Sequence, residues 1–95
     1  MSNLEPKFPL GQTVATPGAL AALAESGQEP SEFLRRHECG DWGSTLDPQD
    51  VTENEFSLTN GLRLMSEYVT SKGVHLWCIT EADRSSTCLL LPEEY

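Results

Sequence analysis

The sequence predicts a small α+β protein in which two to three N-terminal helices pack on a three-stranded antiparallel meander. Residues 16–60 have a proline at the start and a glycine at the end of each expected helix. Residues 62–92 contain short apolar runs separated by turn sequences. Helices that precede a set of adjacent strands are typical of a two-layer arrangement.

At 95 residues, the chain is expected to form one domain over residues 1–95. It divides into an extended N-terminal arm, a helical part and a β-meander, at residues 1–15, 16–60 and 62–92. Prolines and a glycine keep the arm from forming a helix. Its apolar side chains, such as Phe8, are expected to pack onto the body.

The first helix is predicted at "ATPGALAALAESG" from its end signals. Thr16 is the expected N-cap, Pro17 the first helical residue and Gly27 the stop. Side chains three and four residues apart share a helix face. The expected buried face is Leu20, Leu23 and Ala24.

The second helix is predicted at "EPSEFLRRHECG", between Pro30 and the stop at Gly40. Its charges follow the helix dipole, with acids in the first turn and arginines near the end. Phe33, Leu34 and His37 lie at helical spacing and are expected to share one face.

The third helix is predicted over "LDPQDVTENEFSLTNG", with Asp47 as cap and Asn60-Gly61 as stop. Val51, Glu55 and Leu58 mark its expected face. Because Asn-Gly is also a hairpin signal, "EFSLT" is open to interpretation as a strand. The acids of the first turn favour the helix.

Three strands are predicted, at "LRLMSEYVT", "VHLWCITEA" and "TCLLLP". In the middle strand, alternation places Leu76, Cys78 and Thr80 on one face, and His75 and Trp77 on the other. Both faces are apolar near the centre. The helices are therefore expected to cover one face, and the arm or a partner to touch the other.

The charge balance argues against two classes of partner. Six Lys and Arg against fifteen Asp and Glu give a net charge of −9. Such a surface repels phosphates, so neither direct nucleic-acid binding nor binding to an anionic membrane is expected. A basic surface on another protein is electrostatically compatible, for example the DNA-binding face of a second protein.

Three cysteines, an odd and scattered number, predict no disulfide framework. The start "MSNLEPKFPLGQ" lacks the pattern of a signal peptide, and no apolar stretch is long enough to span a bilayer. These features predict a cytoplasmic chain.

Two His–Cys pairs raise the question of a metal site. His37 and Cys39 are two residues apart on a predicted helix, so their side chains diverge. His75 and Cys78 are three residues apart on a predicted strand and lie on opposite faces. Neither spacing is that of a zinc site. We therefore expect no metal and no cofactor.

A catalytic cluster is the alternative interpretation of two polar stretches, "HECGDWG" and "TEADRSST". If they converge, they would form a small hydrolase or nuclease site of His37, Asp41, Glu81, Asp83 and Arg84. Structural roles compete with this interpretation. Asp83 suits a turn, His37 a helix end, and Trp42 a plug in the core.

The stretches "HECGDWG", "NGLRLMSEY" and "LWCITEADRSSTCLLLPEEY" resemble a family of small uncharacterised plasmid-related proteins of bacterial mobile elements. Some of its members are labelled type I restriction endonuclease subunit M. The resemblance covers nearly the whole chain, and "ITEADRS" is its most specific part. It implies an accessory protein of mobile elements, and it supplies no catalytic residues that could be assigned to this chain.

Methyltransferase activity is rejected from the residues themselves. An adenine methyltransferase needs a glycine-rich cofactor site and an (Asn/Asp)-Pro-Pro-(Tyr/Phe) motif for the flipped base. The nearest match in this chain is "DPQD", at the start of a predicted helix.

The sequence thus favours a non-enzymatic protein-binding module, with a DNA-mimicking or anti-defence type as its sharper version. Trp42, Glu81, Asp83 and Arg84 are its candidate binding residues. The expected partner is a protein with a basic surface, and the chain itself is expected to be a monomer or homodimer. A homodimer would form through an uncovered sheet face on which Tyr68 or Trp77 is exposed in the single chain.

Overall fold

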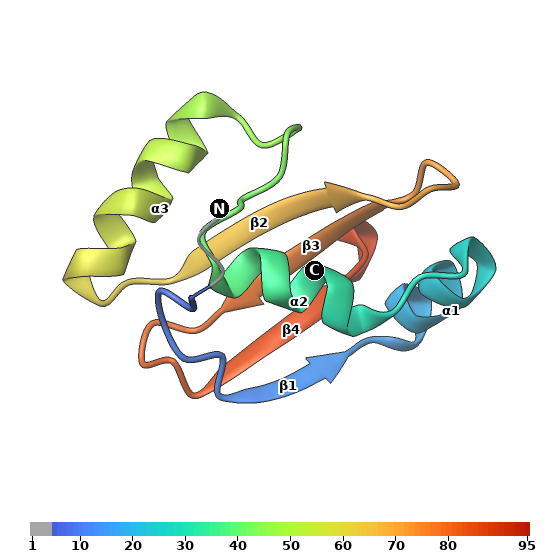
Figure 1. Cartoon of the computed structure of the whole chain (residues 1–95), viewed down its shortest axis with the longest axis horizontal. Helices are drawn as coiled ribbons and strands as arrows, with labels where there is room; N and C mark the ends of the chain where they lie inside the picture. The colour runs from blue at the N-terminus through green and yellow to red at the C-terminus, as the bar shows by residue number, and fades with distance from the viewer. Residues whose placement is uncertain (1–4) are drawn as a thin grey trace.

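The computed structural model describes residues 5–95 and contains three α-helices and one four-stranded mixed sheet (Figure 1). The elements in chain order are β1 (Gln12–Ala15), α1 (Pro17–Ser26), α2 (Pro30–Glu38), α3 (Pro48–Asn60), β2 (Leu64–Val69), β3 (His75–Thr80), β4 (Ser86–Leu90) and a 3₁₀ turn (Pro92–Glu94). The strand order is β1-β4-β3-β2. The α+β class and the antiparallel β2-β3-β4 meander are confirmed, but the three-stranded sheet is wrong.

The missed strand, β1, comes from the arm and pairs with β4 in parallel. The N–H of Gln12 donates to the carbonyl of Ser85 at 3.0 Å. Gly11 permits this approach, because a Cβ there would lie 2.4 Å from that carbonyl oxygen and its φ is +68°. Pairing across some seventy residues of chain leaves no local pattern. The predicted arm also included residues 1–4, which lie outside the described residues.

The ends of α1 are confirmed, but of its predicted face only Leu23 is buried. The Thr16 hydroxyl accepts from the Ala19 N–H, and Gly27 ends the helix in the left-handed conformation. Leu20, however, is 49% exposed, and Ala24 is also exposed. The buried side chains are Ala19, Ala22 and Leu23. The core therefore lies against the small alanine side chains, which let the helix approach closely.

The predicted face of α2 is confirmed, with Phe33 and His37 buried and Leu34 half-buried. The third segment is a helix over its whole length, so the strand interpretation of "EFSLT" is wrong. Its buried residues are Asn54 and Ser57. Of the predicted face, Val51 and Leu58 are half-buried against the core cluster of Phe8 and Trp42, whereas Glu55 is exposed.

The core lies between the sheet and the helices (Figure 1). On β3, Leu76, Cys78 and Thr80 are fully buried, which confirms the predicted alternation. The arm packs on this same side, because Phe8 joins Trp42 in a buried cluster. The prediction that the arm touches the second face is therefore wrong for Phe8. That face meets the C-terminal residue instead, where the rings of Trp77 and Tyr95 are 5.6 Å apart.

Tyr68, one of the two residues expected to be exposed on an uncovered sheet face, is 2% exposed, and its ring packs 5.3 Å from that of Phe33 in the core. Among the helices of residues 5–95, none is long and apolar enough to cross a membrane.

Candidate functional site

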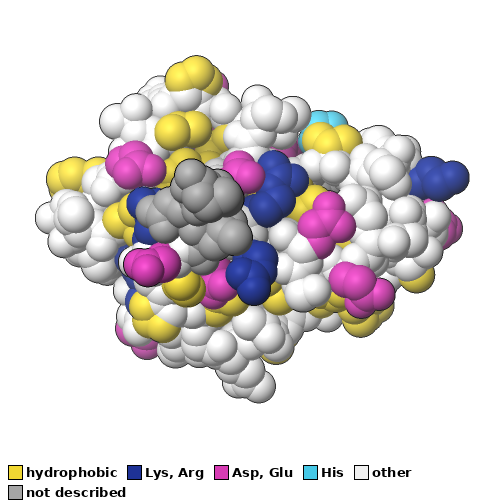
Figure 2. Space-filling view, in the orientation of Figure 1, with side chains coloured by type: hydrophobic (Ala, Val, Ile, Leu, Met, Phe, Trp, Pro, Cys, Tyr) yellow, Lys and Arg dark blue, Asp and Glu magenta, His cyan; other side chains and the backbone are white. Residues whose placement is uncertain are grey.

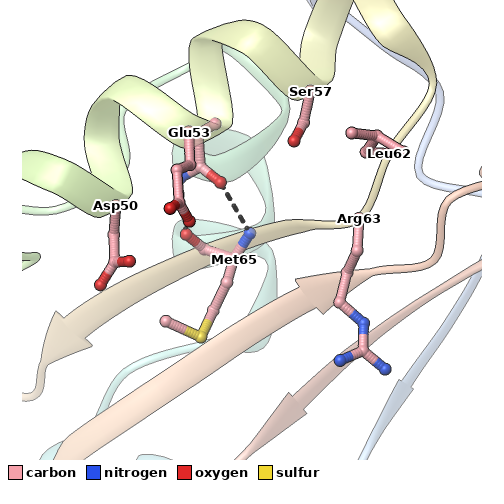
Figure 3. A pocket seen from close by; sticks show the side chains of 7 residues that line it. Asp50, Glu53, Ser57, Leu62, Arg63 and Met65 are labelled. Carbon is pink, nitrogen blue, oxygen red and sulfur yellow. Dashed lines mark hydrogen bonds between the residues drawn. The ribbon is translucent and has the colours of Figure 1, made fainter.

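A hollow of about 350 Å³ opens between α3 and the start of β2 (Figure 3). One wall is the face of α3, and the floor is the chain that leads from the helix into the strand. Its lining residues are Asp50, Glu53, Asn54, Ser57, Leu62, Arg63 and Met65.

The helix presents four polar side chains to this hollow in a regular pattern. Asp50, Glu53, Asn54 and Ser57 follow the i, i+3, i+4, i+7 spacing of a single helix face. The carboxylates of Asp50 and Glu53 both project from α3 toward the side where Met65 lies (Figure 3). The helix itself is started by Asp47, whose side chain accepts from the Gln49 N–H at 2.8 Å.

Asn54 fixes the distance between the helix and the strand. Its side-chain amide donates to the Met65 carbonyl at 2.7 Å, and its carbonyl oxygen accepts from the Met65 N–H at 3.1 Å. A side chain thus takes the place of a neighbouring strand along β2. These two hydrogen bonds tie the α3 wall of the hollow to the backbone of β2.

The local charge is strongly acidic. From Asp47 to Asn60 the chain contains four carboxylates and no Lys or Arg. Arg63 lines the hollow, but its guanidinium donates to the Tyr95 hydroxyl at 2.7 Å and lies 3.8 Å from Glu81. The cation is thereby held away from Asp50 and Glu53. The hollow combines two carboxylates with apolar surface from Leu62 and Met65, and this suits a cation on an aliphatic stem.

His37, the central residue of the catalytic hypothesis, is fully buried. Its ring nitrogens contact the Ser66 and Thr80 hydroxyls, the latter at 2.9 Å. Desolvation, with a further contribution from the Arg84 charge, lowers the pKa of His37 to about 3. The imidazole is therefore neutral at physiological pH and has no contact with solvent.

The stretches "HECGDWG" and "TEADRSST" are in contact. Thr80, the first residue of the second stretch, is hydrogen-bonded to His37, the first residue of the first stretch. Phe8 also stands between them, with its ring 5.2 Å from that of His37 and 5.7 Å from the Arg84 guanidinium. The two stretches therefore meet in the packed interior and not across a cleft. The arm residue Phe8 fills the space that a cleft between the histidine and the arginine would need.

The other candidate residues have local partners. Asp41 pairs with Arg36 at 2.7 Å, and although burial acts to raise the pKa of Asp41, the hydrogen bonds from Arg36 and Gly43 hold it below its usual range. The exposed Asp83 accepts from the Ser85 N–H, as expected for a turn, and this interaction lowers its pKa. Asp41 and Asp83 are therefore each held by a local structural partner.

Arg84 has a positive φ of 62° and directs its guanidinium inward. It donates to the carbonyls of Leu62 at 2.6 Å and Ser57 at 3.0 Å, at the C-terminal end of α3. Glu81 is exposed and lies near Arg63. Of the proposed binding residues, Glu81 and Asp83 are thus at the surface.

Trp42 is 4% exposed and acts as the core plug that the sequence suggested. Its indole N–H donates to Glu55 at 2.8 Å, which anchors the loop after α2 to α3. Its ring therefore offers almost no surface to a partner. Within residues 5–95, no group of three His, Cys, Asp or Glu side chains could hold a metal ion.

Comparison with protein-family models, with curated protein sequences and with solved structures gives no match. The resemblance to plasmid-related proteins therefore stays a prediction, and function is argued from the site itself.

The residues of the hollow were missed at the sequence level. The signal was present, because polar residues at 50, 53, 54 and 57 form one stripe on a predicted helix. The face of this helix was instead predicted from its apolar residues Val51 and Leu58. Only the position of β2 beside the polar stripe turns these residues into a site.

Proposed function

We propose that this protein acts by binding a basic segment of another protein, without catalysis, at the hollow between α3 and β2. The observation that carries the proposal is the pairing of Asp50 and Glu53 above an apolar floor, with Arg63 held aside by Tyr95 and Glu81. A lysine or arginine side chain from a partner fits this arrangement. Its stem would lie on Leu62 and Met65, and its charge would meet the two carboxylates.

The net charge of −9 supports the same kind of partner, because a strongly acidic protein attracts a basic one over a distance. The negative charge is not evenly distributed over the surface. On the face seen in Figure 2, acidic side chains are scattered and basic ones stand among them. The α3 segment has no such compensation in its own sequence, so it is the favoured place of contact.

The buried state of His37 supports binding over hydrolysis. A general base must reach the proton that it removes, and this imidazole is enclosed by hydroxyl groups and by Phe8. In contrast, the hollow is open to solvent and has a volume of about 350 Å³.

A salt-dependent capture experiment tests the proposal. The tagged protein is incubated with host lysate at about 50 mM and about 500 mM salt, since ion pairs at a surface weaken as salt rises. We expect a partner that is retained at low salt and released at high salt. The Asp50→Asn/Glu53→Gln variant is expected to retain about tenfold less of it.

The matched control is Glu25→Gln/Glu93→Gln, which changes the net charge by the same amount at two exposed acids outside α3. This control should retain the partner as the unaltered protein does. Equal loss in both double variants would mean that only overall charge matters, and the hollow would not be the site. The absence of any partner at low salt would also contradict the proposal.

If the basic partner is a DNA-binding protein, the acidic surface of this chain would act as a mimic of DNA. The dispersed acids along the chain favour this version. Duplex DNA added to the captured complex should then displace the partner in proportion to its concentration. A complex that resists DNA competition would exclude DNA mimicry and leave basic-protein binding in place.

A further inference from the structure

The two edges of the sheet differ in how they are covered. Along β2, Asn54 satisfies the Met65 backbone, and the Glu67 N–H donates to the Trp42 carbonyl at 3.1 Å. At the opposite edge, β1 has β4 on one side and no further strand of the described chain on the other (Figure 1). One edge is therefore closed by other parts of the protein and the other is open.

The hydrogen bonds of β1 show which backbone groups the open edge offers. Gln12 and Thr16 direct their N–H groups to β4, at 3.0 Å from the carbonyls of Ser85 and Leu89. In a parallel ladder every second residue bonds the same neighbour, so the intervening residues face the other way. Thr13 and Ala15 therefore present their N–H and C=O groups outward.

A groove of about 190 Å³ runs beside this edge, between β1 and α2. It is lined by Thr13, Val14, Ala15, Pro30, Leu34 and Leu89. The helical layer stops short of β1. Thr87 on β4 is fully buried, while its register partner Thr13 is exposed. The space beside Leu34 is thus available to an apolar side chain from outside.

We propose that the β1 edge is a second docking site, where an extended segment of a basic partner protein adds as a fifth strand. This proposal depends on the proposed function only in that the partner is a basic protein. Main-chain hydrogen bonds to Thr13 and Ala15 supply the attachment, and alternate apolar side chains enter the groove beside Leu34.

Negative charge near the β1 edge favours a basic segment as its occupant. Glu29 is the residue next to the groove residue Pro30, and the Glu94 carboxylate is bonded to Thr16 and Gly18, directly after β1. The Glu94 carboxylate thus lies at the end of β1 and Glu29 adjoins the groove in sequence, so a lysine or arginine in the added segment would be favoured there.

A second copy of this chain is a poorer occupant. Each copy carries a net charge of −9, and self-pairing would bring the two acidic chains together. The edge is also only four residues long, and a contact of that length is far smaller than the interface of a stable dimer, which buries about 1,200 Å² or more.

The test is an NMR titration of the ¹⁵N-labelled full chain with a capped peptide, Lys-Val-Thr-Val-Thr-Val-Lys. We expect the largest amide shifts, and slower hydrogen exchange, at Thr13 and Ala15. The same peptide with Glu in place of Lys should bind about tenfold more weakly or less still.

Two protein variants locate the site. Thr13→Pro removes an outward N–H without removing a bond to β4, and edge strands tolerate proline. It should weaken peptide binding about tenfold or more, whereas Thr13→Val should stay within about twofold of the unaltered protein. Leu34→Lys leaves β1 unaltered but places a cation in the groove, and it should weaken binding as strongly as the proline variant.

Three results would overturn the proposal. The first is the absence of shifts at Thr13 and Ala15, including the case in which they cluster around Asp50 and Glu53 and support the α3 hollow alone. The second is equal peptide binding by Thr13→Pro, Leu34→Lys and the unaltered protein. The third is protection of the Thr13 and Ala15 amides that rises with protein concentration without peptide, because a second copy would then occupy the edge.

Discussion

His37 and Thr80 are hydrogen-bonded in the core, with Nε2 and Oγ1 2.9 Å apart. The contact belongs to a buried chain of polar groups. Thr87 donates its hydroxyl proton to the Leu10 carbonyl at 2.7 Å, so it must accept from Thr80, and Thr80 must accept from Nε2–H. Nδ1 then accepts from Ser66. For the neutral imidazole that the low pKa indicates, the network thus places the single ring proton on Nε2 and gives every member a partner.

This arrangement predicts a loss of stability in mild acid. The pKa of His37 is about 3 in the folded protein against an ordinary value of 6.5. Between these values the unfolded chain binds a proton that the folded chain does not, so stability falls as the pH falls. From pH 7 to pH 5 the free energy of unfolding should decrease by about 2 kcal/mol. Urea unfolding at the two pH values measures it.

The control for this prediction is His37→Gln, which has no titratable group at the site. The variant will be less stable at both pH values, but its stability should change little between them. If the pH dependence is the same in both proteins, His37 is not its cause.

Ser66→Ala is predicted to destabilise the fold by about 1–3 kcal/mol, because it leaves the buried Nδ1 of His37 without a donor. The matched variant is Ser71→Ala in the exposed β2–β3 turn, which should cost less than about 1 kcal/mol. Denaturant unfolding at pH 7 compares them. Equal costs would show that the imidazole tolerates the loss.

Asn54→Ala is predicted to have two effects. Loss of both bonds to Met65 should lower stability by about 2–3 kcal/mol, and the exposed edge of β2 should make the protein prone to self-association. Unfolding and sedimentation velocity measure these effects. Gln49→Ala, an exposed change on the same helix, serves as control and should alter neither. A variant that stays monomeric at high concentration would contradict the second effect.

Gly43→Ala is predicted to be far more damaging than Gly61→Ala. Both glycines have positive φ, but a Cβ at Gly43 would lie 1.7 Å from the Glu67 carbonyl oxygen, while none of the described atoms lies within 4 Å of one at Gly61. The Gly61 change should cost about 1 kcal/mol, from backbone strain alone. The Gly43 change should cost at least about 3 kcal/mol, because the loop must leave the edge of β2. Thermal unfolding of both proteins tests this difference, and similar melting temperatures would refute it.

The ends of α1 and α3 were predictable because they depend on nearby residues. Thr16 caps α1 and Asp47 caps α3 through bonds to amides two or three residues away. The alternation of β3 was predictable for the same reason. The buried faces of α1 and α3 were predictable only in part. Leu23, Val51 and Leu58 pack on the core as expected, but Leu20 and Glu55 have the same helical spacing and are exposed. Only the position of the sheet distinguishes these faces.

The sequence by itself determined the local elements, the acidic charge and the meander, since capping, alternation and net charge are properties of neighbouring residues or of composition. Tertiary structure alone decided the rest. It added β1 beside β4, placed Asn54 against the edge of β2, and enclosed His37 beneath Phe8. Each of these contacts joins segments distant in the chain, and its energy depends on burial and geometry that exist only after the segments have packed together.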